Sequence, residues 1–375
     1  MKIRCNRQRL SEAFQLAQIV VPQKSTIPTL TNVKLTASKE DKKNSIVELT
    51  GTDLEVGLKY TISAVDVKDE GSIIVSANRL AGILRENIDD EITIESDGNV
   101  ANVVCSSSKY KVVCADPTDF PELPNFEKSK SISIATEDLG EMIKKTLFAV
   151  STDLVRYALT GILFEIKGKE IRMVSSDGKR LALIKRKISG KAGDDAAKDI
   201  KALIPPKTMT LLDRVLTEED DMVGLNVEES QIKLKTKSAM IFSRLVEGAF
   251  PDYEAVIPTD RNKKVELNTT QLLTTIRRAT IMTNEKSRAV QLRFNKDKLI
   301  VFTRTQDIGE ANSDMQIDYK GEDLEIAFNP DYITDYLKVV SDEKIELHLK
   351  DKTTAGVFKA GKDYTYVIMP LTISM

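Results

Sequence analysis

The chain has 375 residues, of which 41% are hydrophobic and 30% are charged, and its formal net charge is −2. This composition is typical of a soluble globular protein, and the length suits two or three domains that each bury a core. No apolar stretch is long enough to cross a bilayer, which argues against a membrane protein. The net charge alone does not indicate a nucleic-acid partner.

The cysteines and the first residues predict the cellular compartment. Cys5, Cys105 and Cys114 are too few, and odd in number, for a disulfide framework. The opening Met-Lys-Ile-Arg-Cys lacks the apolar run of a secretory signal. We therefore expect a reduced, cytoplasmic protein without a membrane partner.

The first predicted unit contains two helices among alternating strands and ends with the pair Phe120-Pro121. Apolar residues at helical spacing indicate its first helix: Leu10, Ala13, Phe14 and Ala17. Ser76 is the predicted N-cap of the second helix. Alternating β-branched residues predict strands at residues 32–35, 47–50 and 91–94.

The second predicted unit repeats this order and ends with Phe250-Pro251. Thr136 is the predicted N-cap of its first helix, and Pro206 lies near the start of its second helix. A flexible loop is expected over Gly190–Lys198. Strands are predicted at residues 162–165, 171–174 and 223–227.

The third predicted unit ends with Met369-Pro370 and has the clearest helix start in the chain. Asn329 followed by Pro330 is an N-cap with proline at the first helical position. An apolar stripe indicates the other helix: Leu272, Leu273 and Ile276. Strands are predicted at residues 290–294, 299–302 and 344–347.

Three kinds of marker recur at a spacing close to one third of the chain. They are the helix at the head of each unit, the closing proline pair, and an aspartate after a strand, which is Asp53, Asp177 or Asp307. The period is too long for a solenoid, so it indicates three copies of one α+β domain. We expect domains at 1–125, 126–258 and 259–375, with linkers at Pro121–Lys130 and Pro258–Lys264.

Every predicted helix carries a lysine or arginine, whereas the acidic residues lie mostly in loops and strand ends. Two interpretations remain open. The cations belong to ordinary solvated helix faces, or the helices share one basic surface that holds a phosphate backbone without reading bases.

The sequence gives little support for catalysis. The single histidine, His348, lies between two leucines in a predicted strand, where a structural role is expected. Asp53 and Glu55 alternate with apolar residues, which favours a turn over a catalytic carboxylate pair. Metal-ligand spacings and glycine-rich phosphate loops are also lacking, so no metal or cofactor is expected. An enzyme of repeated α+β architecture, or an adaptor that binds peptides without DNA, are the alternative hypotheses.

Six segments, in order along all three units, resemble signatures of the bacterial DNA polymerase III beta subunit family, the sliding clamps. They are Leu49–Glu55, Val155–Glu165, Ser176–Ala182, Gly248–Tyr253, Thr283–Lys286 and Tyr366–Pro370. The resemblance implies a head-to-tail homodimer that closes into a ring with helices lining the hole. It implies a non-catalytic clamp on double-stranded DNA without sequence preference. The implied protein partners are the DNA polymerase III catalytic subunit, a clamp loader complex and other proteins with a clamp-binding motif.

The resemblance also implies an apolar pocket that receives short partner peptides. The positions that match the family pocket are Leu159, Ser176, Gly178, Lys179, Arg180, Leu181, Pro251, Val256, Val367, Met369, Pro370 and Leu371. Without the resemblance, Leu181, Val256 and Val367 would be interpreted as core residues.

For DNA contact, Lys24, Lys207 and Arg244 match basic family positions, and the predicted helices add Arg79, Lys144 and Arg277. For the dimer interface, the matching residues are Lys109, Tyr110, Val112, Ile281 and Met282. The lysines Lys109 and Lys111 could face Asp307, Glu310 and Asp314 across the joint; ordinary hairpin chemistry is the alternative.

The chain also departs from the family pattern. Ala249, Glu254 and Ala255 stand where relatives often have arginine, and Ala158 stands where an aromatic residue is common. The chain ends in Thr372–Met375 rather than in a short tail with arginine. These differences predict weaker DNA contact near the second domain and an altered pocket rim.

Overall fold

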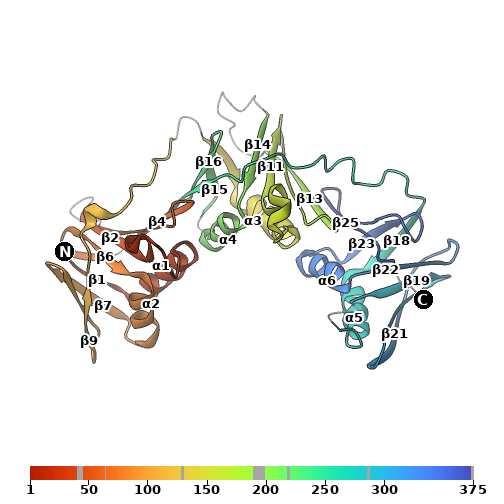
Figure 1. The fold of residues 1–375 in the computed structure, drawn as a ribbon, viewed down its shortest axis with the longest axis horizontal. Coiled ribbons are helices and arrows are strands. Elements are labelled where there is room, and N and C mark those ends of the chain that lie inside the picture. The colour runs from red at the N-terminus through yellow and green to blue at the C-terminus, as the bar shows by residue number, and fades with distance from the viewer. Residues whose placement is uncertain are drawn as a thin grey trace. The chain divides into compact units, whose positions relative to one another are not determined.

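The computed structural model describes residues 1–39, 45–63, 65–127, 131–188, 199–217, 220–284 and 288–372. Its tertiary contacts divide the chain into two compact units. The first contains Met1–Glu137 and Lys207–Leu245, and the second contains Asp138–Ile188 and Val246–Met375. Each unit therefore combines one outer repeat with part of the middle repeat, as the chain colours in Figure 1 show.

The six predicted helices are all present. They are α1 (Arg7–Val20), α2 (Ala77–Glu86), α3 (Thr136–Thr146), α4 (Pro206–Val215), α5 (Thr269–Thr280) and α6 (Pro330–Val339). In α1 the apolar stripe is buried, with Leu10 and Phe14 fully inaccessible to solvent. That stripe packs against α2 and against strands β3 (Ser45–Thr52) and β4 (Val56–Ile62), and α5 packs against α6 in the same way (Figure 1).

Two of the three predicted N-caps are confirmed. The Ser76 hydroxyl accepts the Arg79 N–H at 3.4 Å, and the Asn329 side chain accepts the Asp331 N–H at 2.9 Å. The prediction for Thr136 is wrong, because α3 begins at Thr136 itself, directly after strand β10 (Ile132–Ala135). The Thr136 backbone N–H donates to Asp221 O at 3.1 Å. Its hydroxyl is buried without a hydrogen-bond partner among the described residues.

The first unit contains a five-stranded and an eight-stranded antiparallel sheet. The five-stranded sheet has the order β5 (Asp66–Asp69), β1 (Lys2–Asn6), β7 (Glu91–Asp97), β8 (Val100–Val104), β9 (Lys109–Val113). The eight-stranded sheet has the order β10, β15 (Met222–Val227), β16 (Gln231–Lys235), β17 (Ala239–Arg244), β4, β3, β2 (Asn32–Lys39), β6 (Gly71–Ser76).

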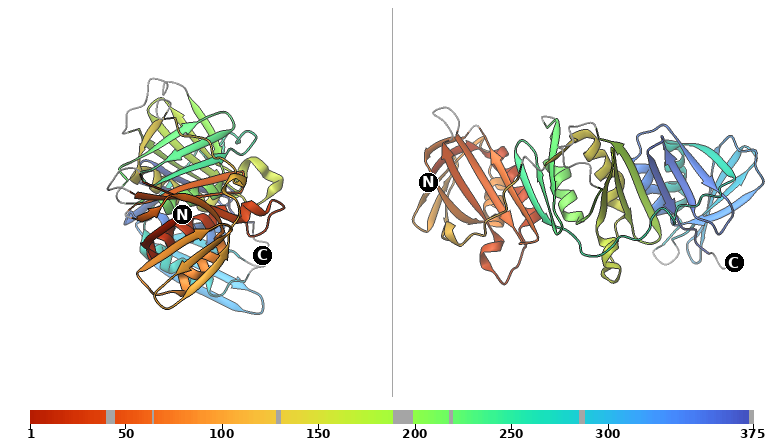
Figure 2. Two further views of the ribbon diagram at one scale, coloured as in Figure 1. Left: turned by 90° about the vertical axis from the view of Figure 1, so that its left-hand side faces the viewer. Right: turned by 90° about the horizontal axis from the view of Figure 1, so that it is seen from above.

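The second unit contains another eight-stranded sheet and a four-stranded sheet. The larger one has the order β14 (Ile200–Ile204), β11 (Ile162–Lys167), β12 (Glu170–Ser176), β13 (Arg180–Lys187), β25 (Tyr364–Ile368), β24 (Gly356–Ala360), β23 (Lys344–Leu349), β18 (Lys263–Asn268). The smaller one has the order β21 (Gly309–Gln316), β20 (Lys298–Thr305), β19 (Val290–Asn295), β22 (Leu324–Phe328). The strands of each sheet run side by side in the two views of Figure 2.

Both eight-stranded sheets cross a boundary between repeats. In the first unit β4 of the first repeat pairs with β17 of the second, with Leu58 opposite Ile241. In the second unit β13 pairs with β25 of the third repeat, with Leu181 opposite Val367. Each sheet is therefore continuous across the joint between two repeats, and the predicted α+β class with antiparallel strands is confirmed.

The aspartate markers of the first two repeats form the same turn. The carboxylate of Asp53 accepts the N–H groups of Glu55 at 3.0 Å and Val56 at 2.6 Å. Asp177 accepts those of Lys179 and Arg180 in the same way. Hydrogen bonds of this kind are typical of Asx turns. The turn interpretation of Asp53 and Glu55 is therefore confirmed.

The predicted connections agree in part with the structure. Residues 121–127 have no regular secondary structure, whereas Lys128–Lys130 lie outside the described residues. The connection predicted at Pro258–Lys264 is shorter than expected, because β18 already begins at Lys263. The predicted loop Gly190–Lys198 also falls outside the described residues. Within the described chain, no helix combines the length and apolarity that crossing a membrane requires.

Candidate functional site

An apolar layer covers one face of the eight-stranded sheet in the second unit. Side chains alternate between the two faces of a strand, so every second residue of β11, β12, β13 and β25 points to this face. The residues that form it are Leu163, Val174, Leu181, Leu183 and Val367, and all are buried. This layer is the floor of the candidate site.

Residues 246–257, here called the strap, cross this floor without regular secondary structure. The strap enters where the Val246 N–H donates to Leu203 O at 2.8 Å. Tyr253 is buried within the apolar layer, and Val246, Phe250 and Ile257 pack against it. The strap therefore forms one wall above the sheet.

A short 3-10 helix, η5 (Leu154–Thr160), forms the opposite end of the site. Its Arg156 donates to Asp177 O at 3.2 Å and covers the turn between β12 and β13. Gly178 in that turn has φ +83°, and a Cβ atom there would lie 1.9 Å from the Arg156 guanidinium. The positive φ favours glycine at this position, whereas the flexible Arg156 side chain could move away from a Cβ atom.

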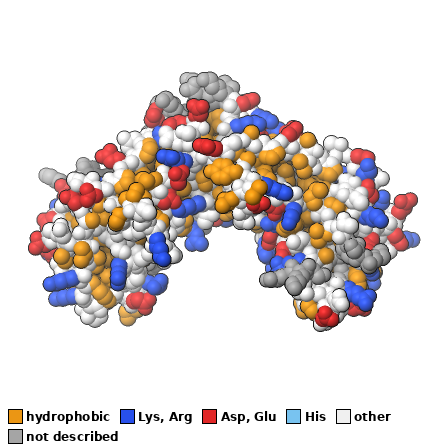
Figure 3. Space-filling model, viewed as in Figure 1, with side chains coloured by type: hydrophobic (Ala, Val, Ile, Leu, Met, Phe, Trp, Pro, Cys, Tyr) orange, Lys and Arg blue, Asp and Glu red, His pale blue; other side chains and the backbone are white. Residues whose placement is uncertain are grey.

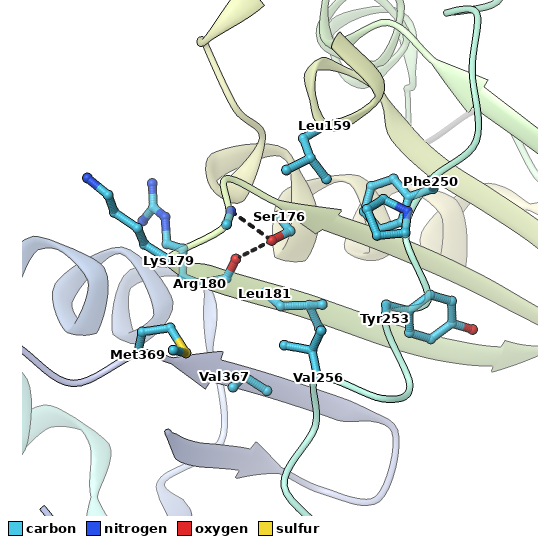
Figure 4. Close-up of a pocket in the computed structure, with 12 residues that line it drawn as sticks. Leu159, Ser176, Lys179, Arg180, Leu181, Phe250, Tyr253, Val256, Val367 and Met369 are labelled. Atoms are coloured by element: carbon cyan, nitrogen blue, oxygen red, sulfur yellow. Dashed lines mark hydrogen bonds between the residues drawn. The ribbon is translucent and has the colours of Figure 1, made fainter. Parts of the chain in front are cut away.

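The floor, the strap and η5 enclose a cavity of about 160 Å³ (Figure 4). It is lined by Leu159, Ser176, Gly178, Lys179, Arg180, Leu181, Phe250, Pro251, Tyr253, Val256, Val367 and Met369. The structure thus brings together all the predicted pocket residues except Pro370 and Leu371. These two do not line the cavity, because the chain leaves β25 after Ile368 and the Leu371 N–H donates to Ala327 O at 2.8 Å.

Two lining residues, Phe250 and Tyr253, were missed by sequence reasoning. Phe250 belongs to the recurring Phe-Pro marker, and Tyr253 closes the matched segment Gly248–Tyr253. Both signals are present in the sequence, where they indicate the repeat and the family signature but do not by themselves indicate a pocket.

Burial separates the floor of the pocket from its rim. Leu181 and Val367 are 3% and 1% exposed, so their interpretation as core residues also holds. Val256 and Met369 are 48% and 47% exposed, so the core interpretation is wrong for Val256, and both side chains belong to the rim of the cavity. Such a pocket suits apolar side chains of a ligand that removes these surfaces from water.

Arg180 links the pocket to the third repeat. Its guanidinium lies 2.8 Å from Asp335 of α6 and 3.1 Å from Asp177, and it stacks over the Tyr332 ring at 4.5 Å. The side chain is only 11% exposed. Arg180 therefore holds β13 against α6, while the Ser176 hydroxyl, which accepts the Gly178 N–H at 3.1 Å and donates to Arg180 O at 2.7 Å, fixes the adjoining turn (Figure 4).

The predicted DNA-contact residues fall into two groups. Lys24, Arg79, Lys144 and Arg277 are exposed. Lys207 instead lies 2.5 Å from Asp53 and donates to Val20 O at 3.0 Å, across the joint between the first two repeats. Arg244 is itself exposed and lies 3.7 Å from Glu55, which is exposed as well. Both cations therefore have partners within the protein.

Acidic and basic side chains are intermixed on the face shown in Figure 3. The mixture of charges on this face agrees with the net charge of −2.

The predicted interface residues lie at two sheet edges or beside them. Lys109, Tyr110 and Val112 belong to β9, at one edge of the five-stranded sheet. Ile281 and Met282 follow α5, and Ile281 is 72% exposed. Asp314, one of the acids expected near the lysines, lies 3.1 Å from Lys298 of its own chain.

The histidine and the acidic residues of the described chain show no arrangement suited to a metal. Among these residues, His, Cys, Asp and Glu do not form a group of three that could hold an ion. The Nε2 atom of His348 lies 2.8 Å from Glu346 on the same strand.

Comparisons with known proteins agree along the whole chain. Models of the N-terminal, central and C-terminal domains of the DNA polymerase III beta subunit match residues 1–124, 133–252 and 254–372. The beta sliding clamp of Pseudomonas aeruginosa is 32% identical over 100% of both chains. That of Chlamydia pneumoniae is 30% identical over 100% of this chain and 99% of its own.

Solved structures give the same result. A crystal structure of the Pseudomonas aeruginosa sliding clamp bound to griselimycin has a TM-score of 0.90 at 32% identity, covering 100% of both chains. The sliding clamp of Bacillus subtilis has a TM-score of 0.90 at 27% identity with the same coverage.

The fold and these matches define a three-domain clamp protein. The chain belongs to the DNA polymerase III beta subunit family, the bacterial beta sliding clamps. Its function is that of a non-catalytic processivity subunit of DNA polymerase III, so the enzyme hypothesis is excluded.

Proposed function

We propose that the protein closes as a head-to-tail homodimer around duplex DNA and tethers the catalytic subunit of DNA polymerase III through the pocket beneath the strap. A clamp loader complex and other proteins with a clamp-binding motif are further proposed partners, in the cytoplasm. We also propose domain boundaries at 1–125, 126–258 and 259–375. The observation that carries the proposal is the pairing of strands at the joints between repeats.

Equivalent strands form each joint. The strand after the aspartate turn is β4, β13 or β21, and the strand that closes each repeat is β9, β17 or β25. Within the chain β4 pairs with β17 and β13 with β25, both antiparallel. This leaves β21 and β9, which are edge strands of the described sheets. If β21 of one protomer pairs with β9 of the next, the interface is heterologous, because two different surfaces meet. Two copies joined in this way close into a ring.

The interface should be disrupted by a charge at its centre. We expect the wild-type protein to be a dimer at micromolar concentration in light scattering, and Ile281→Asp to be a monomer. The carboxylate would be buried without a partner, which weakens association by at least tenfold. Val155→Asp is the matched control, because Val155 is 91% exposed and belongs to η5 of the middle repeat, outside both β9 and β21. A monomeric wild type, or equal effects of both changes, would contradict the proposed interface.

The exposed cations support electrostatic contact with a phosphate backbone that reads no bases. Lys24→Ala with Arg277→Ala should reduce the slope of log affinity against log salt by about one unit for each lost phosphate contact. Fluorescence anisotropy with a short duplex at several salt concentrations measures that slope.

Lys207→Ala provides the contrast, because its ammonium is bound by Asp53 and Val20. We expect this change to lower the thermal unfolding temperature and to leave the salt slope nearly unchanged. An unchanged slope in the Lys24 and Arg277 variant would mean that those two residues do not face DNA.

A further inference from the structure

We propose that Glu165 is a positioning residue of the peptide pocket: through the hydroxyl of Tyr253 it anchors the strap that forms one wall. This inference rests on the proposed peptide-binding function of the pocket. It adds to that function the group that fixes the position of the wall.

A row of charged residues crosses the sheet beneath the strap. Glu165 on β11 lies directly opposite Arg172 on β12 and directly opposite Lys201 on β14 in the strand register. The Glu165 side chain is fully buried, although its neighbours on the same face form the apolar floor. A buried carboxylate is costly unless it is paired and hydrogen-bonded, so its partners identify what it stabilises.

Those partners come from three separate elements. The Tyr253 hydroxyl of the strap donates to Glu165 Oε2 at 2.8 Å. The Lys201 ammonium forms an ion pair with Oε1 at 2.9 Å. Lys167 lies more distant, 3.9 Å from Oε2.

The charge distribution agrees with an ionised Glu165. Burial opposes ionisation, but Lys201 and Tyr253 outweigh it and hold the pKa of the Glu165 carboxyl below its ordinary value. Burial, together with the nearby carboxylate, raises the pKa of Tyr253 to about 12, while Arg172 acts in the opposite direction. The hydroxyl therefore remains a donor and the carboxylate an acceptor at neutral pH.

Arg172 completes the anchor from the other side. It donates to the Tyr253 hydroxyl oxygen at 3.1 Å and to the Glu254 carboxylate at 2.5 Å. Its Nε atom also lies 2.6 Å from Glu170 Oε1. Glu254 follows Tyr253 in the strap, so this departure from the family pattern gives the strap a second attachment. The Tyr253 hydroxyl is thus held between an acceptor and a donor on adjacent strands.

The anchor acts on the residues that face the ligand. The ring of Tyr253 lines the cavity, and its hydroxyl points away from the other lining side chains (Figure 4). Phe250, Pro251 and Val256 lie on the same strap and line the same cavity. Without the anchor, part of the binding free energy must be spent on ordering this wall, which lowers affinity without removing any contact to the ligand.

The test compares Tyr253→Phe, which removes only the hydroxyl, with wild type. The probe is a fluorescein-labelled short synthetic peptide with leucine and phenylalanine near its C-terminal end. We expect its affinity to fall about tenfold, as for loss of one hydrogen bond to a charged group. Tyr319→Phe is the matched control, because the Tyr319 hydroxyl is also buried and donates to Glu322 O at 2.6 Å.

A second measurement separates positioning from general stability. Hydrogen exchange should accelerate about tenfold at the Val256 and Ile257 amides, which donate to Tyr253 O and Glu254 O. The rest of the unit should exchange at the wild-type rate. Glu165→Gln, which keeps an acceptor oxygen, should retain most of the affinity that Glu165→Met loses.

Each result decides between the hypotheses. Unchanged exchange in the strap, faster exchange throughout the unit, or unchanged peptide affinity in Tyr253→Phe would overturn the positioning role. If the wild type fails to bind the probe, the proposed peptide site is overturned instead, and exchange in the strap alone then decides whether Glu165 anchors it.

Discussion

Once loaded onto a nicked circular plasmid, the protein should stay with the DNA through gel filtration and should be lost after the circle is cut. A closed ring is held by topology, so retention does not require strong contacts. The net charge of −2 makes ordinary electrostatic retention weak at physiological salt. The expected difference between intact and cut circles is therefore nearly complete.

This experiment requires the matching clamp loader and ATP, with loader activity verified on another clamp. Equal retention on both DNA shapes would indicate simple electrostatic binding. Loss from both would favour an adaptor that binds peptides without encircling DNA. Ile281→Asp provides an internal control, because a chain that does not close should be lost from the intact circle as well.

The second large effect concerns the pocket rim. Val256→Ala with Met369→Ala should reduce affinity for the labelled peptide about 100-fold, because both half-exposed side chains are expected to bury most of their remaining apolar surface against the ligand. The dimer should remain intact in light scattering. Fluorescence anisotropy of the peptide measures the loss directly.

Leu181→Ala is a less suitable variant. Leu181 is only 3% exposed within the apolar floor, so its truncation is expected to cost about 2–5 kcal/mol of folding stability as well. Met222→Ala is the control for the rim variant, since Met222 is a partly exposed methionine (38%) that belongs to the first unit, outside the pocket. Unchanged affinity in the rim variant would remove the pocket from the proposed function.

Local sequence signals predicted local structure well. The apolar stripe of α1 and the caps Ser76 and Asn329 depend on residues within a few positions of each other, and all three are confirmed. Thr136 has the same chemistry but failed as a cap. There the helix already includes Thr136, and its buried hydroxyl has no hydrogen-bond partner among the described residues.

The candidate site was predictable only through its resemblance to a family. Periodicity alone assigns Leu181 and Val367 to the core, which is true but does not reveal a pocket. The anchor of the strap joins Glu165 to Tyr253, which are 88 residues apart in the chain. No local pattern predicts that pairing.

The ion-pair partners of charged residues are equally hard to predict from local sequence. Lys207 near the start of α4 has the same sequence signal as an exposed helix cation. Its partner Asp53 comes from another repeat, 154 residues earlier in the chain. A single sequence gives the sign of each charge but not the neighbour that neutralises it.

The continuous sheets also explain why three repeats share one polypeptide. A single excised repeat would expose one strand edge of each kind, such as β4 and β9, without the covalent neighbour that now covers β4. Copies of such a fragment could add head to tail with no fixed number at which they must stop, and uncovered edges of this kind promote fibres and aggregates. Covalent linkage of three repeats makes the β4–β17 and β13–β25 joints intramolecular, so that only the proposed joint between β21 and β9 depends on association between chains.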